Sequence, residues 1–290
     1  MKQILIIFYL IFPILLSAQL NLEWGNRYNG EGDWLDYARS MVVDEFNNIY
    51  VTGKTYRGDS LDYEMIIIKY DNSGNEIWKK FWTYGNYGDI DPNSIHLDTK
   101  GNIYVVGNIT YTGLMIVKFD NYGNEIWSKI HSGEFYRYRI KSAKISSTNQ
   151  IYIAAYEDIS EVYHSIFIKY DQFGELLWEV SYSENSNIVK SFVIDTEENI
   201  IATGIANYSY NPIDNIWIGG DVFTVKFNTQ GELIWESIYA SPEDNYESGR
   251  SIGIDTLNNV YVTGMHEGDN YDIITLSYNS SGDERWINIY

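Results

Sequence analysis

Hydrophobic residues in this chain gather in short runs that are separated by clusters of Asp, Asn and Gly. The runs are rich in Ile, Val and Tyr, which favour strands, and the clusters are rich in residues that favour tight turns. A chain built in this way favours strands of five to seven residues that pair with their neighbours through short hairpins. The pattern therefore predicts an all-β protein.

The runs recur in units of four, which we call strands A to D. Strand A is expected at residues 40–44, 94–98, 143–146, 191–195 and 251–255. Strand B is expected at 48–53, 102–107, 150–155, 199–204 and 259–264, and strand C at 65–70, 114–119, 165–170, 222–227 and 272–278. Strand D begins with a phrase in which Gly precedes a Trp by four residues, and that Trp is Trp78, Trp127, Trp178, Trp235 or Trp286.

Units of this kind cannot bury both sheet faces alone, so they must stack, and radial stacking gives a β-propeller. We expect about five four-stranded antiparallel blades, preceded by a lone strand or cap at residues 22–28 that carries a sixth Trp, Trp24. Six blades, one of them incomplete, is the alternative. The repeated Trp residues are expected to wedge between neighbouring blades, so that Trp127→Ala should cost roughly 3–5 kcal/mol.

The chain divides into an expected signal peptide and one domain. Met1 to Gln3, the apolar run at 4–16 and the small residues Ser17 and Ala18 fit a secretory signal over residues 1–19. Residues 20–290 then form a single propeller domain with repeat units at about 38–82, 92–130, 139–181, 189–239 and 249–290. An uncleaved anchor is the alternative, although the apolar run is short for a membrane span.

These units resemble a known family. The stretch Asn259 to Gly264, followed by an apolar strand and the Gly-to-Trp phrase, resembles the SBBP-type bacterial β-propeller repeat, and the resemblance covers nearly all of residues 22–290. The order is also similar to quinoprotein-type repeats but lacks their Asp-Gly turn between the second and third strands. The resemblance implies a secreted or surface bacterial protein and implies no single activity.

Charge narrows the choice of partners. The chain has 40 acidic and 20 basic residues, a formal net charge of −20, and no cysteine. A field of this sign disfavours nucleic acids and anionic membranes. Stability must come from packing rather than from disulfides.

The loops suggest where a site could lie. The A–B and C–D turns are short and regular, whereas the B–C and D–A loops vary in length, so we expect any site on the face that these loops form. Aromatic and acidic loop residues could stack on a sugar or grip a peptide, or could pack the loops onto the blades instead. The candidate binding residues are Trp34, Trp82, Tyr84, Tyr87, Asp89, Tyr208, Trp217, Asp244 and Tyr246.

The motifs of common catalytic sites are missing. The four His residues, His96, His131, His164 and His266, occupy unrelated repeat positions, and there is no Cys nucleophile. The turn Asp residues lack the alternating ligands of a calcium loop. We therefore predict no catalytic residues, no metal site and no cofactor.

The function predicted from the sequence is that of a secreted or cell-surface binding or scaffolding module for a glycan, peptide or protein. We expect a monomer that binds no nucleic acid and has no membrane span after signal cleavage. The alternatives are a carbohydrate-active hydrolase or lyase acting in the propeller funnel, and a purely structural envelope protein. A carboxylate cluster with raised pKa values in the funnel would favour the enzyme.

Overall fold

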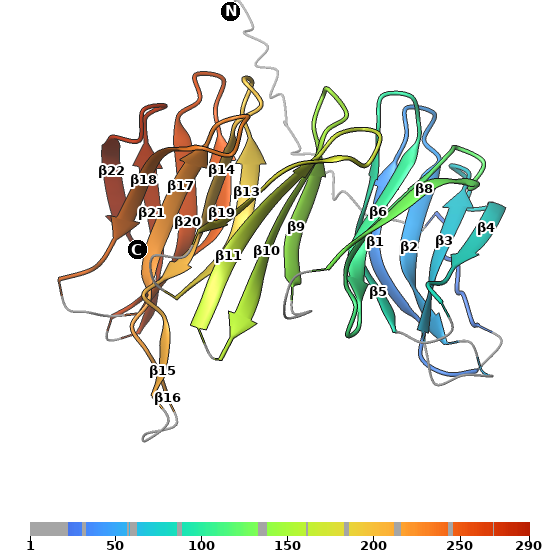
Figure 1. The fold of residues 1–290 in the computed structure, drawn as a ribbon, viewed down its shortest axis with the longest axis horizontal. Coiled ribbons are helices and arrows are strands. Elements are labelled where there is room, and N and C mark those ends of the chain that lie inside the picture. Colours follow the sequence, from blue (N-terminus) through green and yellow to red (C-terminus); the bar gives the residue numbers. More distant parts are fainter. Residues whose placement is uncertain are drawn as a thin grey trace, which may run out of the picture.

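The computed structural model describes residues 23–30, 33–56, 58, 63–85, 89–132, 138–160, 162–182, 186–211, 216–242, 246–268 and 270–290. The predicted signal peptide lies outside these residues. The described part consists of five four-stranded antiparallel sheets and one small hairpin (Figure 1). The prediction of five four-stranded blades is therefore confirmed. Among the described residues, no helix is long and apolar enough to cross a membrane.

Each sheet contains consecutive strands, apart from the small hairpin inserted in the fourth. Sheet 1 has β1 (Tyr37–Val43), β2 (Ile49–Tyr56), β3 (Tyr63–Tyr70) and β4 (Glu76–Trp82). Sheet 2 has β5 (Ile90–Leu97), β6 (Ile103–Ile109), β7 (Gly113–Phe119) and β8 (Glu125–His131). Sheet 3 has β9 (Arg139–Ile145), β10 (Ile151–Ile159), β11 (Val162–Tyr170) and β12 (Leu176–Tyr182).

Sheet 4 has β13 (Asn187–Ile194), β14 (Ile200–Ala206), β17 (Asp221–Phe227) and β18 (Leu233–Tyr239). Its B–C insertion forms a hairpin of β15 (Ser209–Asn211) and β16 (Ile216–Ile218). Sheet 5 has β19 (Glu247–Ile254), β20 (Val260–Glu267), β21 (Tyr271–Tyr278) and β22 (Glu284–Ile289).

The turns are fixed by Asp side chains. In the A–B turn of sheet 5, Asp255 Oδ1 accepts hydrogen bonds from the backbone N–H groups of Leu257 and Asn259, and Oδ2 accepts one from the Asn259 amide at 2.8 Å. The Asn259 amide and the turn N–H groups lower the pKa of Asp255 to about 2. The same arrangement recurs at other turns, with the carboxylate oxygens engaged by the turn itself, at Asp44, Asp71, Asp98, Asp120 and Asp195.

Neighbouring sheets join through the repeated Trp residues. The Trp of each of sheets 1 to 4 lies against the glycine of the next sheet's C–D turn, and a Cβ on Gly282 would lie 2.6 Å from the Trp235 ring. These glycines also have positive φ, which is a second reason for glycine at the position. The equivalent pairs are Trp78 with Gly123, Trp127 with Gly174 and Trp178 with Gly231.

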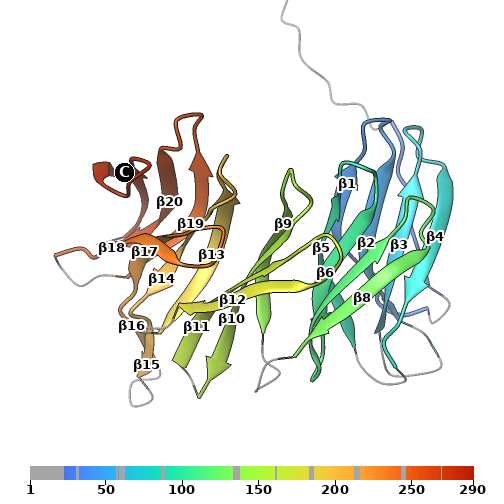
Figure 2. The ribbon, with the colours of Figure 1, turned by 45° about the horizontal axis from the view of Figure 1, so that its top comes forward.

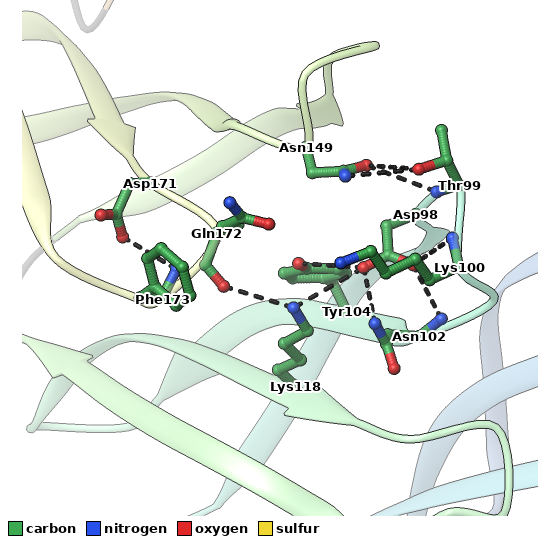
Figure 3. A network of polar contacts seen from close by, with 10 residues as sticks. All are labelled: Asp98, Thr99, Lys100, Asn102, Tyr104, Lys118, Asn149, Asp171, Gln172 and Phe173. Atoms are coloured by element: carbon green, nitrogen blue, oxygen red, sulfur yellow. Dashed lines mark hydrogen bonds and ion pairs between the residues drawn. The ribbon is translucent and has the colours of Figure 1, made fainter.

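A lysine of strand C adds a second connection between sheets. Lys118 Nζ lies 3.6 Å from Asp98 of its own sheet and donates to the Gln172 carbonyl of sheet 3 at 3.3 Å (Figure 3). The ammonium group also lies 4.7 Å from the Tyr104 ring centroid. Lys169 repeats the connection one sheet later, donating to a carbonyl in the C–D turn of sheet 4.

The N-terminal segment behaves as a cap. Residues 23–28, expected as a lone strand, form no strand. Trp24 nevertheless lies against Gly74 in the way that each repeat Trp lies against the next turn, and the Asn26 amide donates to the Gly74 carbonyl. The indole therefore packs as a repeat Trp without belonging to a sheet.

The sheets follow one another in chain order, with the first and fifth at opposite ends of the molecule (Figures 1 and 2). Among the described residues, the main packing contacts of each sheet are with its neighbours in sequence. The two end faces are accordingly open. Met41 of β1 is 59% exposed, whereas the equivalent Ile95 of β5 is 2% exposed. At the other end Ile273 is 57% exposed, whereas its equivalents in sheets 1 to 4 are fully buried.

This difference gives a matched pair of substitutions. Ile95→Ala should lower the free energy of unfolding by about 2–5 kcal/mol, because it opens a cavity between sheets 1 and 2. Met41→Ala, at the same repeat position, should change it by less than about 0.5 kcal/mol, because the side chain is exposed. Urea unfolding followed by tryptophan fluorescence measures both values, and equal losses would contradict the open end face.

Candidate functional site

The innermost strand of every sheet carries a β-bulge at the same repeat position. Strands β1, β5, β9, β13 and β19 contact one another in sequence, so they line a common axis. In each strand one residue is skipped in the pairing with strand B. A bulge leaves its extra residue unpaired and turns the side chain in a new direction. The five skipped residues are Arg39, Asn93, Lys141, Lys190 and Arg250.

Four of these five residues are basic, although the chain carries a net charge of −20. Burial, together with the nearby charges of Lys141 and Arg250, lowers the pKa of Lys190 to about 8. Lys141 and Arg250 are therefore both close enough to Lys190 for their charges to act on its ammonium group. None of the three forms an ion pair with any carboxylate of the described part. We call Lys141, Lys190 and Arg250 the basic row.

Arg39 differs from the basic row because it is neutralised. Its Nε donates to Asp91 Oδ1 at 2.9 Å and its Nη2 to Asp91 Oδ2 at 3.1 Å. Lys54 Nζ lies 3.7 Å from the same carboxylate. A bidentate ion pair therefore links sheets 1 and 2 at the axis.

A cleft of about 930 Å³ opens beside this ion pair. Its walls come from the beginnings of β1, β5 and β9 and from the ends of β6 and β10, and they are mostly polar. These strand ends adjoin the B–C and D–A connections, the face on which the sequence predicts a site. The side chains that matter below are those of Asn93, Asn108, Tyr111, Arg139 and Asp158.

Tyr111 stands at the rim of the cleft in a strained conformation. It lies in the turn between β6 and β7, which is closed by the Thr112 N–H donating to the Ile109 carbonyl at 3.0 Å. Its φ is 61°, in the left-handed region that costs a bulky residue energy. The side chain is 89% exposed, so burial does not offset this cost. Strain of this kind gathers at functional sites.

A second hollow of about 630 Å³ lies further along the inner strands. His96 and Lys144, from β5 and β9, are among the residues that line it. Burial and the charge of Lys144 lower the pKa of His96 to about 4. The imidazole is therefore uncharged at neutral pH.

The predicted site residues of sheet 1 take different positions. Trp34 is 64% exposed, with its ring centroid 6.2 Å from that of Tyr56. Trp82 is buried, and its indole N–H donates to Glu125 of sheet 2 at 2.8 Å. Tyr84 stacks on Trp82 with the ring centroids 6.4 Å apart.

The other predicted residues form a second group. The rings of Tyr208 and Tyr246 meet with centroids 6.1 Å apart, in a cluster with Tyr163. Asp89 accepts a hydrogen bond from a backbone N–H of β3 at 3.0 Å. Trp217 lies in β16, and Tyr87 and Asp244 lie outside the described residues. The contacts place the two aromatic groups on sheets that are not neighbours.

A cluster of His131, Tyr138 and Glu179, of which only Tyr138 is buried, joins sheets 2 and 3. His131 Nε2 lies 3.1 Å from Glu179 Oε2, and the Tyr138 hydroxyl donates to Glu179 Oε1 at 2.9 Å. The His131 hydrogen bond lowers the pKa of Glu179. The residues equivalent to His131 are Trp82 in sheet 1 and Tyr182 in sheet 3. Each of them also donates a hydrogen bond to a Glu of the next sheet, Trp82 to Glu125 and Tyr182 to Glu236. The repetition identifies the cluster as a connection between sheets.

Within the described ranges, no three His, Cys, Asp or Glu side chains come together in a way that could hold a metal ion. The turn Asp residues are engaged by N–H donors as described above.

Sequence reasoning missed the basic row. The five skipped residues, at 39, 93, 141, 190 and 250, each stand directly before a Ser at or next to the start of the predicted strand A, and the three members of the row are among them. Aligning the repeats on this Ser would have revealed the charges. The bulge that directs them toward the axis carries no sequence signature that we recognise.

Comparison with known proteins supports the fold. Residues 27–58 match the family described as "SBBP: Beta-propeller repeat", which confirms the resemblance predicted from the repeats. No curated protein matches the chain.

Two solved structures share the architecture at low identity. One is a PL25 ulvan lyase bound to -[GlcA(1-4)Rha3S]-, with a TM-score of 0.58, 11% identity, and coverage of 85% of this chain and 68% of the lyase. The other is a protein of unknown function from Dyadobacter fermentans DSM 18053, with a TM-score of 0.51, 9% identity, and coverage of 85% and 80%. At these identities the likeness shows the fold alone.

The low pKa of His96 predicts acid sensitivity. The unfolded chain takes up this proton near pH 6.5 and the folded chain only near pH 4, so folding stability falls as the pH drops through that window. The loss at the end of the window should be about 3 kcal/mol at most. Comparing urea unfolding of the wild type and His96→Gln at pH 7.0 and 4.5 checks this; an equal drop in both proteins would contradict it.

Proposed function

We propose that this chain is an exported binding module that holds a glycan in the cleft at the inner ends of β1, β5 and β9. The observation that carries the proposal is Tyr111, an exposed and strained aromatic residue at the rim of a polar cleft of about 930 Å³. Sugar rings present apolar faces that stack on aromatic side chains and hydroxyls that need polar partners. The cleft offers both within one site.

The polar partners come from rigid elements. Asn93 occupies the bulge of β5, and Arg139 begins β9. The Asn108 amide donates to the Tyr138 carbonyl at 2.7 Å, which fixes the side chain across sheets 2 and 3. Groups held by strands reach a ligand without the ordering cost that a mobile loop would add.

The ulvan lyase supports the proposal in a limited way. The solved lyase is bound to -[GlcA(1-4)Rha3S]-. A protein of this fold therefore holds a glycan. The case for this chain rests on its own cleft.

The charge state of the carboxylates favours binding over hydrolysis. A glycosidase of the usual kind needs a carboxylic acid with a raised pKa. Every carboxylate with a clearly shifted pKa in the described part of the chain is shifted downward, namely Asp44, Asp71, Asp98, Asp120, Glu179, Asp195 and Asp255.

Export belongs to the same proposal. Residues 1–19 have the charged, apolar and small-residue regions of a secretory signal. We expect the mature chain outside the cytoplasm, as a secreted, periplasmic or surface protein, where free glycans are available.

Tyr111→Asn separates binding from stability. Asn tolerates the left-handed conformation better than Tyr, so the variant should be as stable as the wild type or slightly more so. Removing the aromatic face should lower glycan affinity at least tenfold. A glycan array probed with the chain from Leu20 to Tyr290 selects the ligand, and calorimetry with that ligand gives the affinities.

Tyr122→Asn is the matched control, because Tyr122 is exposed in a C–D turn on the opposite face. Trp217→Ala tests the predicted loop residue in the same assay. Unchanged affinity in Tyr111→Asn, or an equal loss in Tyr122→Asn, would remove the cleft from the proposal. If the wild type binds no glycan on the array, the proposal of glycan binding itself is overturned.

A further inference from the structure

We propose that the ligand is an anionic polysaccharide whose acidic groups are held by the basic row, Lys141, Lys190 and Arg250, along the inner strands of sheets 3 to 5. This inference rests on the proposed glycan-binding function and names the chemical class of the glycan. It adds a second binding surface, which continues the cleft along the axis.

The first argument is the geometry of the bulges. The three residues are skipped in the pairing of β9 with β10, β13 with β14 and β19 with β20, each at the same repeat position. Inner strands of consecutive sheets contact one another. The bulges therefore place one cation per sheet along one line.

The second argument is electrostatic. The charges of Lys141 and Arg250 act on Lys190, and none of the three side chains has an ion-pair partner among the described carboxylates, in a chain with 40 acidic residues. Arg39, at the same position of sheet 1, is neutralised by Asp91. Lys141 and Arg250 are exposed, whereas Lys190 is partly buried beside them without a counter-ion. A ligand that brings negative charge would supply the counter-ion that the fold does not.

The third argument is continuity with the cleft. Arg139, which lines the cleft, precedes Lys141 by two residues on β9, so both belong to one strand. Lys141 Nζ lies 5.0 Å from the ring centroid of Tyr156, and Arg250 follows Tyr246 of the tyrosine cluster. A polysaccharide that extends from the cleft across β9 would contact cations with aromatic rings beside them. Such a combination suits acidic sugars.

The sparse charge of the row favours a polysaccharide over a nucleic acid. Duplex DNA carries one charge per about 1.7 Å, and most of these would meet an acidic protein surface. A polysaccharide with one carboxylate or sulfate per one or two sugars needs only one cation per sheet. The row thus suits a thin, moderately charged chain.

The experiment compares charge at the row with charge elsewhere. Calorimetry measures binding of the chain from Leu20 to Tyr290 to oligogalacturonate, dextran sulfate and neutral dextran at 50 and 200 mM NaCl. The row variant is Lys141→Gln, Lys190→Gln and Arg250→Gln together. The control is Lys79→Gln, Lys100→Gln and Lys129→Gln, which removes the same charge from other positions.

We expect the wild type to bind an acidic polymer at least tenfold more tightly than neutral dextran, with affinity falling as salt rises. The row variant should lose at least tenfold in affinity and much of the salt dependence, and the control should stay within about twofold of the wild type. The melting temperature of the row variant should equal or exceed that of the wild type, because like-charge repulsion is removed.

Other outcomes overturn the inference in distinguishable ways. Equal binding of neutral and acidic glycans, or an equal loss in the control, refutes the anionic ligand and leaves glycan binding standing. Row-dependent binding of a single-stranded oligonucleotide without binding of polysaccharide refutes the ligand class. A large drop in the melting temperature of the row variant shows that the cations serve the fold.

Discussion

The structure depends on one repeated contact, in which a Trp of one sheet lies against the turn glycine of the next. A four-stranded sheet leaves its faces exposed unless another sheet packs against them. The contact between Trp and glycine determines the position of each sheet relative to the next. The indole N–H of Trp178 adds a hydrogen bond to the Thr229 carbonyl at 2.9 Å. A Cβ at the glycine would overlap the Trp235 indole at Gly282 and would crowd the indole at the other turns, so the contact also limits how the sheets are spaced.

The same contact positions the site. Because each sheet is placed against its predecessor, the inner strands follow one another around the axis and their bulges come into line. The row is therefore as rigid as the sheet packing. Functional groups held on strands in this way keep their spacing without help from loops. The site lowers the stability of the fold locally, because like charges at the row and the strained backbone of Tyr111 oppose folding. The interfaces between sheets supply the stability that offsets this loss.

Much of the fold could be predicted from the sequence, because turns and strands leave local signatures. The Asp and Gly residues of each turn and the Trp that begins strand D gave the number of sheets and their strand order. The repeat position of Trp82 is hidden in the sequence because its equivalents are His131 and Tyr182, and only the shared contact with a Glu of the next sheet reveals it. Open end faces carry no sequence signal, because Met41 is as apolar as the buried Ile95.

The site was harder to predict because it depends on backbone geometry and long-range charge. A lysine in a strand is ordinarily a solvated residue, and only the bulge and the neighbouring sheets make Lys190 one of three clustered cations. At physiological ionic strength charges are screened beyond about 8 Å, so the net acidity of the protein does not cancel the row at contact distance. The acidic surface repels dense polyanions while the row attracts a ligand that reaches the axis. Selectivity among anions then follows from the spacing of charge along the ligand, and the packing of the sheets determines which spacing fits.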